Sequence, residues 1–181
     1  MSNNITDLRS HAFKKGEPIL IDTNVWMATH GPVALHDWRT TIYSNSLKQM
    51  RTYNCNIYVN DMVLAEFVNA FSRYEYNTLP KAKRPTEFKI FRNSTAYKPI
   101  AEEISINVRK ILKISKKCGG CFESIDIDTL VSEFATGKYD FNDIVLEEVC
   151  KLKGLKLLTH DGDFSGKGID ILTANNKLRL T

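Results

Sequence analysis

Short apolar runs alternate along the chain with longer segments in which apolar residues recur every three or four positions. Apolar runs such as Ile19-Leu-Ile21 are typical of strands buried on both faces of a parallel sheet. Apolar residues at the longer spacing predict amphipathic helices. We expect strands at 18–22, 56–60, 122–127, 155–158 and 168–172, and helices at 36–51, 61–73, 99–119, 128–136 and 140–153. This alternation indicates an α/β fold whose central parallel sheet is covered by helices on both faces.

The length of the chain favours a single domain. Its 181 residues, 43% of them hydrophobic, can bury a core but are too few for two ordinary domains. We assign residues 1–16 to a polar N-terminal segment and residues 17–181 to one domain. No apolar stretch approaches the roughly 20 residues that span a bilayer, and the polar N-terminus does not resemble a secretory signal. These features predict no membrane association and a cytoplasmic location.

Positive charge is concentrated in the middle of the chain. Residues 73–117, which we call the basic segment, hold 12 of the 25 basic residues and only four of the 21 acidic ones. A positive, largely helical segment attracts polyanions such as RNA, although a solvated helix face gives the same pattern. Five aromatic residues between 74 and 97 could stack on unpaired bases. The candidate contacts to RNA phosphates are Lys81, Lys83, Arg84, Arg109, Lys110 and Lys113.

Four carboxylates are expected to meet at one edge of the sheet. Asp22 and Asp161 follow strands, and Glu66 and Asp143 lie in the first two turns of helices that begin at the same edge. Two carboxylates about 4 Å apart repel by about 4 kcal/mol at an effective dielectric near 20, so such a cluster requires a cation or a proton. Oxygen ligands favour Mg²⁺ or Mn²⁺ over zinc. The pattern therefore predicts a site for a divalent cation.

Four segments spread over nearly the whole chain carry a further signal. They are Ile19-Leu-Ile-Asp-Thr-Asn-Val25, Leu64-Ala-Glu-Phe67, Asn142-Asp-Ile-Val145 and Leu157-Leu-Thr-His-Asp-Gly-Asp-Phe164. In order and spacing they resemble the PIN domain, a ribonuclease fold best known from VapC-type toxins of toxin–antitoxin pairs. The resemblance implies a Rossmann-like sheet of strand order 3-2-1-4-5 and a Mg²⁺- or Mn²⁺-dependent endoribonuclease that leaves a 3′-hydroxyl and a 5′-phosphate. It also implies a homodimer and, for a toxin, an antitoxin protein as partner.

The resemblance also implies roles for particular residues. The four acids named above match the family's catalytic and metal-binding quartet, and Asp163 matches an auxiliary acid. Asp140 competes with Asp143 for the third position, and we prefer Asp143 because Ile144-Val-Leu146 follows it, as the family pattern expects. The polar residues that would orient the carboxylates or contact phosphate are Thr23, Asn24 and Thr159. The long basic segment departs from a compact toxin.

Several alternatives stay open at the level of the sequence. Asp22-Thr-Asn24 is also similar to the start of haloacid-dehalogenase phosphohydrolases, but Asn24 cannot act as the general acid that this chemistry needs. A non-catalytic RNA- or protein-binding PIN module would be expected to lack some of the acids. A housekeeping RNA-processing nuclease and a toxin are not distinguished by these residues. Cys118 and Cys121 form a lone C-x-x-C, which lacks the second ligand pair of a zinc site.

Overall fold

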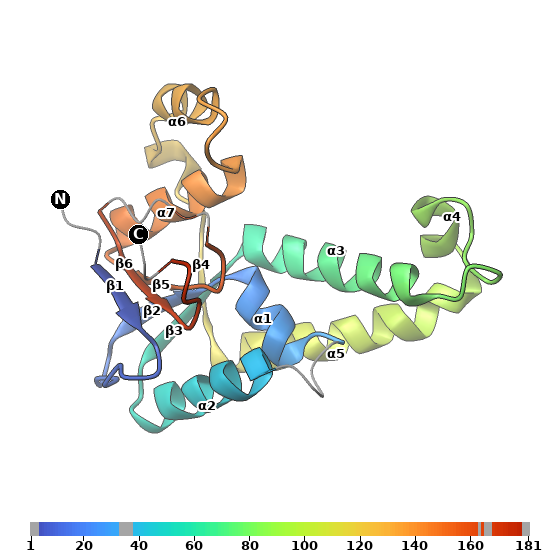
Figure 1. Cartoon of the computed structure of the whole chain (residues 1–181), viewed down its shortest axis with the longest axis horizontal. Helices are drawn as coiled ribbons and strands as arrows, with labels where there is room; N and C mark the ends of the chain where they lie inside the picture. Colours follow the sequence, from blue (N-terminus) through green and yellow to red (C-terminus); the bar gives the residue numbers. More distant parts are fainter. Residues whose placement is uncertain (1–3, 33–37, 163, 165–167, 179–181) are drawn as a thin grey trace.

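The computed structural model describes residues 4–32, 38–162, 164 and 168–178, and a six-stranded parallel sheet lies at the centre of this part of the chain (Figure 1). The strands are β1 (Asn4–Asp7), β2 (Pro18–Ile21), β3 (Asn56–Asn60), β4 (Lys116–Cys118), β5 (Lys156–Leu158) and β6 (Asp170–Thr173). Their order in the sheet is β1-β6-β5-β2-β3-β4, and all neighbours are parallel.

Without β1, this order reads β4-β3-β2-β5-β6, which is the expected order 3-2-1-4-5. The predicted α/β fold is therefore confirmed. Strand β1 extends the sheet beyond β6, and the backbone N–H of Leu8 continues the pairing by donating to Thr173 O over 2.9 Å. Leu8 itself is buried in the core. The N-terminal segment, which we expected to end before the domain begins at residue 17, thus supplies an edge strand of the same sheet.

The strand expected at 122–127 is wrong, and the third strand of the core lies earlier in the chain. Helix α5 ends at Ile114, the following residue Ser115 has an extended backbone, and the short β4 begins next, with Cys118 opposite Asn60 of β3. Residues Phe122–Ser124 instead form the 3₁₀ helix η2, with the Phe122 side chain exposed. Alternation of apolar and polar residues was misleading here because β4 already occupies the position beside β3.

Helices cover the sheet on both faces, with α2 on one side and α7 on the other (Figure 1). The α-helices are α1 (Thr23–His30), α2 (Trp38–Thr52), α3 (Asp61–Thr78), α4 (Phe88–Arg92), α5 (Lys98–Ile114), α6 (Ile127–Phe134) and α7 (Phe141–Lys153), and η1 (Thr95–Tyr97) is a second 3₁₀ helix. Asn60 caps α3 by accepting from Val63 N, and Gly154 ends α7 in the left-handed conformation that glycine tolerates. Within these elements, no helix is long and apolar enough to span a membrane.

The core is centred on the two middle strands. Ile19, Leu20 and Ile21 of β2 and Leu157 and Leu158 of β5 are fully buried. Both strands are apolar on both faces because helices cover both faces of the sheet. Their carboxyl ends are thereby fixed side by side, and the residues that follow them, Asp22 and Thr159, begin the candidate site.

Helices α3 and α5 leave the sheet together and form a helical arm with α4 at its far end (Figure 1). We call residues 61–114 the helical arm. At its tip four aromatic rings lie 5.5–6.4 Å from their neighbours, namely Tyr76, Phe88, Phe91 and Tyr97. Phe91 is almost completely buried. These rings, which the sequence analysis considered for stacking on bases, therefore pack on one another as a small second core.

Candidate active site

Asp22 lies directly after β2 and caps helix α1. Its Oδ1 accepts from Thr23 N, and its Oδ2 accepts from Asn24 Nδ2 over 2.6 Å and from Thr159 Oγ1 over 2.7 Å. The carboxylate is only 6% exposed. Burial without partners would be costly, but three neutral donors hold the group in place. Asp22 is thus a rigidly oriented carboxylate at the carboxyl edge of the sheet.

Thr159, which follows β5, connects Asp22 to Asp161. While its hydroxyl donates to Asp22, the same oxygen accepts from Asp161 N over 2.9 Å and from Asn24 Nδ2 over 3.1 Å. The amide oxygen of Asn24 accepts from His160 N over 2.8 Å. Asn24 and Thr159 therefore orient acidic residues that follow two strands.

Glu66 is placed by the first turns of α3, at the base of the helical arm. The Thr23 hydroxyl donates to Glu66 Oε2 over 3.0 Å, which joins the start of α1 to α3. Glu66 is exposed, in contrast to Asp22. This carboxylate therefore stands at the open side of the site.

The first turn of α7 separates the two candidates for the third acid. Asp140 is exposed and caps the helix, since its Oδ1 accepts from Asn142 N over 2.8 Å. Asp143, one turn later, is half-buried and faces the cavity that also contacts Asp22. The structure thus brings Asp143, and not Asp140, to the other acids.

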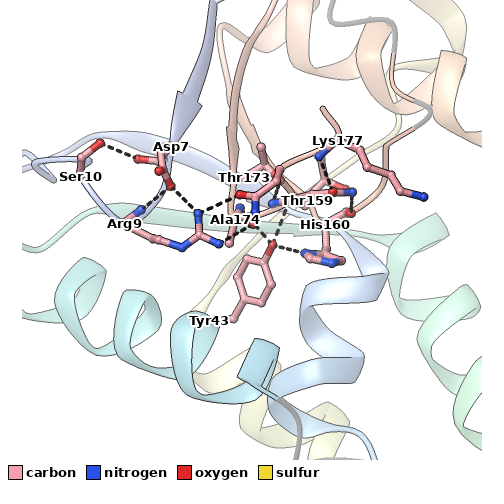
Figure 2. Close-up of polar contacts among 11 residues, drawn as sticks. Asp7, Arg9, Ser10, Tyr43, Thr159, His160, Thr173, Ala174 and Lys177 are labelled. Carbon is pink, nitrogen blue, oxygen red and sulfur yellow. Dashed lines mark hydrogen bonds and ion pairs between the residues drawn. The ribbon is translucent and has the colours of Figure 1, made fainter. Parts of the chain in front are cut away.

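The loop that carries Asp161 is anchored by Tyr43 of α2 (Figure 2). The Tyr43 hydroxyl lies 2.8 Å from His160 Nδ1 and accepts from Ala174 N over 3.3 Å. The Tyr43 ring is fully buried and packs edge-on against the imidazole of His160. His160, the residue before Asp161, is therefore held against α2 at the edge of the sheet.

All four acids line one cavity of about 290 Å³ at this edge of the sheet. Burial, opposed by hydrogen bonds from Thr159 and Thr23, raises the pKa of Asp22 to about 6, and the carboxylates of Glu66 and Asp161 add to this rise. Burial also raises the pKa of Asp143 to about 8, with further contributions from Asp22 and Asp161. The cavity therefore accumulates negative charge that it cannot fully carry at neutral pH without a cation. Its lining residues are Asp22, Thr23, Asn24, Met27, Ala28, Arg39, Thr40, Glu66, Ala70, Asp143 and Asp161.

Comparison with known families and structures agrees with this arrangement. The PIN domain family matches residues 19–169, which include all four acids and the strands and helices that carry them. The chain belongs to the PIN-domain family. Members of this family are nucleases, and the predicted family is confirmed. Among curated proteins, none matches the sequence.

Two solved structures share the fold of this PIN domain. The crystal structure of VapBC2 from Rickettsia felis bound to a DNA fragment from their promoter aligns with a TM-score of 0.55 at 14% identity, over 86% of this chain and 97% of that chain. PAE2754 from Pyrobaculum aerophilum aligns with a TM-score of 0.53 at 13% identity, over 91% of this chain and 89% of that chain. At these identities the likeness concerns the fold.

The donor set of this PIN domain fits a hard divalent cation in chemistry and charge. The four acids present only oxygen atoms, and burial together with the neighbouring carboxylates raises the pKa values of Asp22 and Asp143. Among the described residues, no three acidic, histidine or cysteine side chains are grouped closely enough to hold an ion as they stand. Binding would therefore require the carboxylates to turn toward a common centre. Asp163, the expected auxiliary acid, lies outside the described residues.

The sequence analysis missed the contribution of α2 to the site. Arg39 and Thr40, from the first turn of that helix, line the cavity together with Met27 of α1 and Ala70 of α3. Helical periodicity places α2 against the sheet but gives no sign of which end reaches the acids. The hydrogen bond between Tyr43 and His160, 117 positions apart, decides this.

The candidate RNA contacts divide into two groups on the helical arm. Lys81 and Lys83 are exposed beyond the end of α3, while the guanidinium of Arg84 lies over the ring of Tyr76 at 5.8 Å. On α5, the candidates Arg109, Lys110 and Lys113 are exposed. Lys110 lies near His30 of α1, whose pKa is lowered to about 4 by burial and by this lysine. Positive charge is thus present at the tip and along one helix of the arm.

Proposed function

We propose that this PIN domain is a Mg²⁺- or Mn²⁺-dependent endoribonuclease whose catalytic and metal-binding residues are Asp22, Glu66, Asp143 and Asp161. The observation that carries the proposal is the convergence of four carboxylates on one cavity, with the pKa of Asp143 raised to about 8. Such a cluster lowers stability unless a cation neutralises it, so its presence favours a metal-dependent reaction.

The chain's own residues supply position and proton transfer. Thr159 and Asn24 hold Asp22, and Thr23 holds Glu66, so these hydrogen bonds keep the two carboxylates at the edge of the sheet where they would bind an ion. Asp143 would give up its proton in the ion-bound form, because a ligand carboxylate must be ionised. A bound divalent cation supplies positive charge to the phosphate oxygens and lowers the pKa of water. A carboxylate that does not bind the ion can accept the proton of the attacking water.

The substrate class follows from charge. An acidic cavity repels RNA, whereas the helical arm that begins beside it carries ten basic and six acidic residues. Lys81 and Lys83 at the tip and Arg109, Lys110 and Lys113 on α5 are exposed and suited to phosphate contacts. We assign these residues to binding of the RNA backbone away from the cleaved bond.

A more specific role is the toxin of a toxin–antitoxin pair. One structure with the same fold, described above, is that of a VapBC pair. For this chain the role would require a small antitoxin protein that blocks cleavage, and a homodimer is the assembly we expect. Co-purification with the product of a neighbouring gene, together with inhibition of cleavage, tests it against a housekeeping RNA-processing nuclease.

The deciding experiment is cleavage of a defined single-stranded RNA. We expect cleavage with Mn²⁺ or Mg²⁺, none with EDTA, and products that end in a 3′-hydroxyl and a 5′-phosphate. Protein with Asp22→Asn, purified in the same way, controls for contaminating ribonuclease. Cleavage that persists in EDTA, or that ends in a 2′,3′-cyclic phosphate, would exclude the proposed chemistry.

A further inference from the structure

Arg39 is the one cationic side chain among the described residues that line the cavity. The other charged groups of the lining are the four carboxylates. A polyanionic substrate must come within contact distance of these acids, and a bound divalent ion offsets only part of their charge. A guanidinium on the wall is therefore placed to attract the approaching phosphate.

The position of Arg39 is determined by the anchoring of α2. Arg39 and Tyr43 are four residues apart, so they lie on the same face of the helix. Tyr43 is bound to His160 Nδ1 and Ala174 N at the sheet edge, and Arg39 is near enough to lower the pKa of the Tyr43 hydroxyl, although burial raises it overall. The ring of Trp38 adds a contact with the His160 ring, at a centroid distance of 5.5 Å. The first turn of α2 is thus held beside the loop of Asp161.

Thr40 provides a second, independent observation. Its Oγ1 atom is buried and has no hydrogen-bond partner among the described residues, and the side chain lines the same cavity. A buried hydroxyl without a partner is unfavourable by about 1–3 kcal/mol, so most such groups are satisfied by protein, water or a ligand. An orphan donor beside an arginine in a catalytic cavity points to an oxygen-rich anion that is present only in the complex.

We propose that Arg39 and Thr40 form a phosphate-binding subsite that holds an RNA phosphate next to the four carboxylates. The inference rests on the proposed function and deepens it. The guanidinium presents paired N–H donors that match two oxygens of one phosphate, and the Thr40 hydroxyl donates to the same group. The subsite binds the backbone and reads no base.

The test compares Arg39→Gln with Arg51→Gln, an exposed arginine in the last turn of the same helix. Arg39→Gln is expected to raise KM for a single-stranded RNA about tenfold, with a smaller change in kcat, because it removes a charge-assisted contact to phosphate. The same variant should weaken binding of a fluorescein-labelled RNA in EDTA and lower the slope of log K against log[salt] by about 0.7, the value for one phosphate contact in a single strand. Arg51→Gln should behave like the wild type.

Thr40→Val separates recognition from structure. Valine has the shape of threonine without the hydroxyl, so the variant should bind the labelled RNA about threefold more weakly while its Tm stays equal or rises, because a buried orphan hydroxyl is lost. Thr41→Val, at the exposed neighbouring position, is the matched control. If Thr40 serves only the fold, Thr40→Val would lower the Tm and leave RNA binding unchanged.

The outcomes distinguish the inference from the proposed function. If the wild type cuts RNA and Arg39→Gln matches Arg51→Gln in KM, RNA affinity and salt slope, the subsite is refuted and the ribonuclease stands. If Arg39→Gln lowers the Tm but leaves KM, RNA affinity and the salt slope unchanged, Arg39 serves only the fold and the subsite is refuted. A wild type that cuts no RNA with any divalent ion overturns the proposed function, and the subsite with it.

Discussion

The acidic cavity and the tip of the helical arm are assembled in opposite ways. The cavity joins residues between 22 and 161, and it exists only because a parallel sheet brings the ends of β2, β3 and β5 to one edge. The tip is local, since Tyr76, Phe88, Phe91 and Tyr97 lie within 22 positions of one another. Like charges dominate the cavity, while apolar rings dominate the tip. The cavity therefore depends on the whole fold, whereas the tip is held together by contacts within one segment of the chain.

The largest expected effect concerns the cavity alone. Asp22→Asn should lower kcat for RNA cleavage at least about a thousandfold, because an amide cannot provide the anionic ligand. Asparagine also caps helices well, so α1 should persist. Single-turnover cleavage and circular dichroism measure the two effects, and Asp140→Asn, on the exposed cap of α7, is the control. Equal losses in the two variants would show that acidity in general, rather than the cavity, matters.

The next effect concerns the arm alone. Phe91→Ala removes the most buried ring of the tip, and such a truncation lowers stability by about 3–5 kcal/mol. Because the tip is local, we expect faster amide exchange in residues 76–97 and unchanged exchange in β2 and β5. Native-state hydrogen exchange checks this, with Phe122→Ala at an exposed ring as control. Equal acceleration in the sheet would mean that the arm and the sheet unfold as one unit.

A third prediction tests whether the arm recognises RNA. Replacing Lys81 and Lys83 with alanine should weaken RNA binding about threefold to tenfold and lower the salt slope by about 1.4, for two phosphate contacts. Arg84 is left in place because it packs on Tyr76. Alanine at Lys14 and Lys15, exposed lysines that precede β2 at the opposite edge of the sheet, is the control. If both double variants lose affinity equally, only net charge matters.

The smallest expected effect is on the free energy of unfolding and arises from repulsion between the carboxylates of the cavity. Asp143→Asn should raise the free energy of unfolding of the metal-free protein by about 1 kcal/mol at pH 8, after allowance for solvent screening. Urea denaturation measures it, with Asp140→Asn as the control. A stabilisation by Asp140→Asn of the same size would place the strain at the end of α7 rather than in the cavity.

The repulsion in the cavity also predicts the direction in which stability changes with pH. Burial and neighbouring acids raise the pKa of Asp143 to about 8 in the folded protein, so the folded state holds a proton that the unfolded chain has already lost. The metal-free wild type should therefore lose stability as pH rises from about 4 to 8. The advantage of Asp143→Asn should grow over the same range. Mn²⁺ should stabilise the wild type more than the variant, because the variant lacks one charged ligand. A variant advantage that does not depend on pH would refute the assigned pKa.

Sequence patterns predicted four of the five core strands, five of the helices and the meeting of the acids at one edge. Ile19-Leu-Ile21 and Leu157-Leu158 are apolar throughout, so their burial follows from composition, and the carboxyl ends of parallel strands must share an edge. The order of the five core strands followed from the resemblance to the PIN domain. These conclusions needed no knowledge of which side chains touch.

Contacts between distant segments were decided only by the tertiary structure. The sequence analysis misplaced one strand at 122–127 and missed the edge strand β1. Whether a segment forms a strand depends on which neighbour it pairs with, and local alternation carries no such information. The choice between Asp140 and Asp143 depends on burial at the start of α7. The approach of Arg39 and Thr40 to the cavity depends on contacts between α2 and the sheet edge, including the hydrogen bond between Tyr43 and His160. Hydrophobic periodicity determines which face of a helix is buried, but long-range packing determines where along the sheet its ends lie.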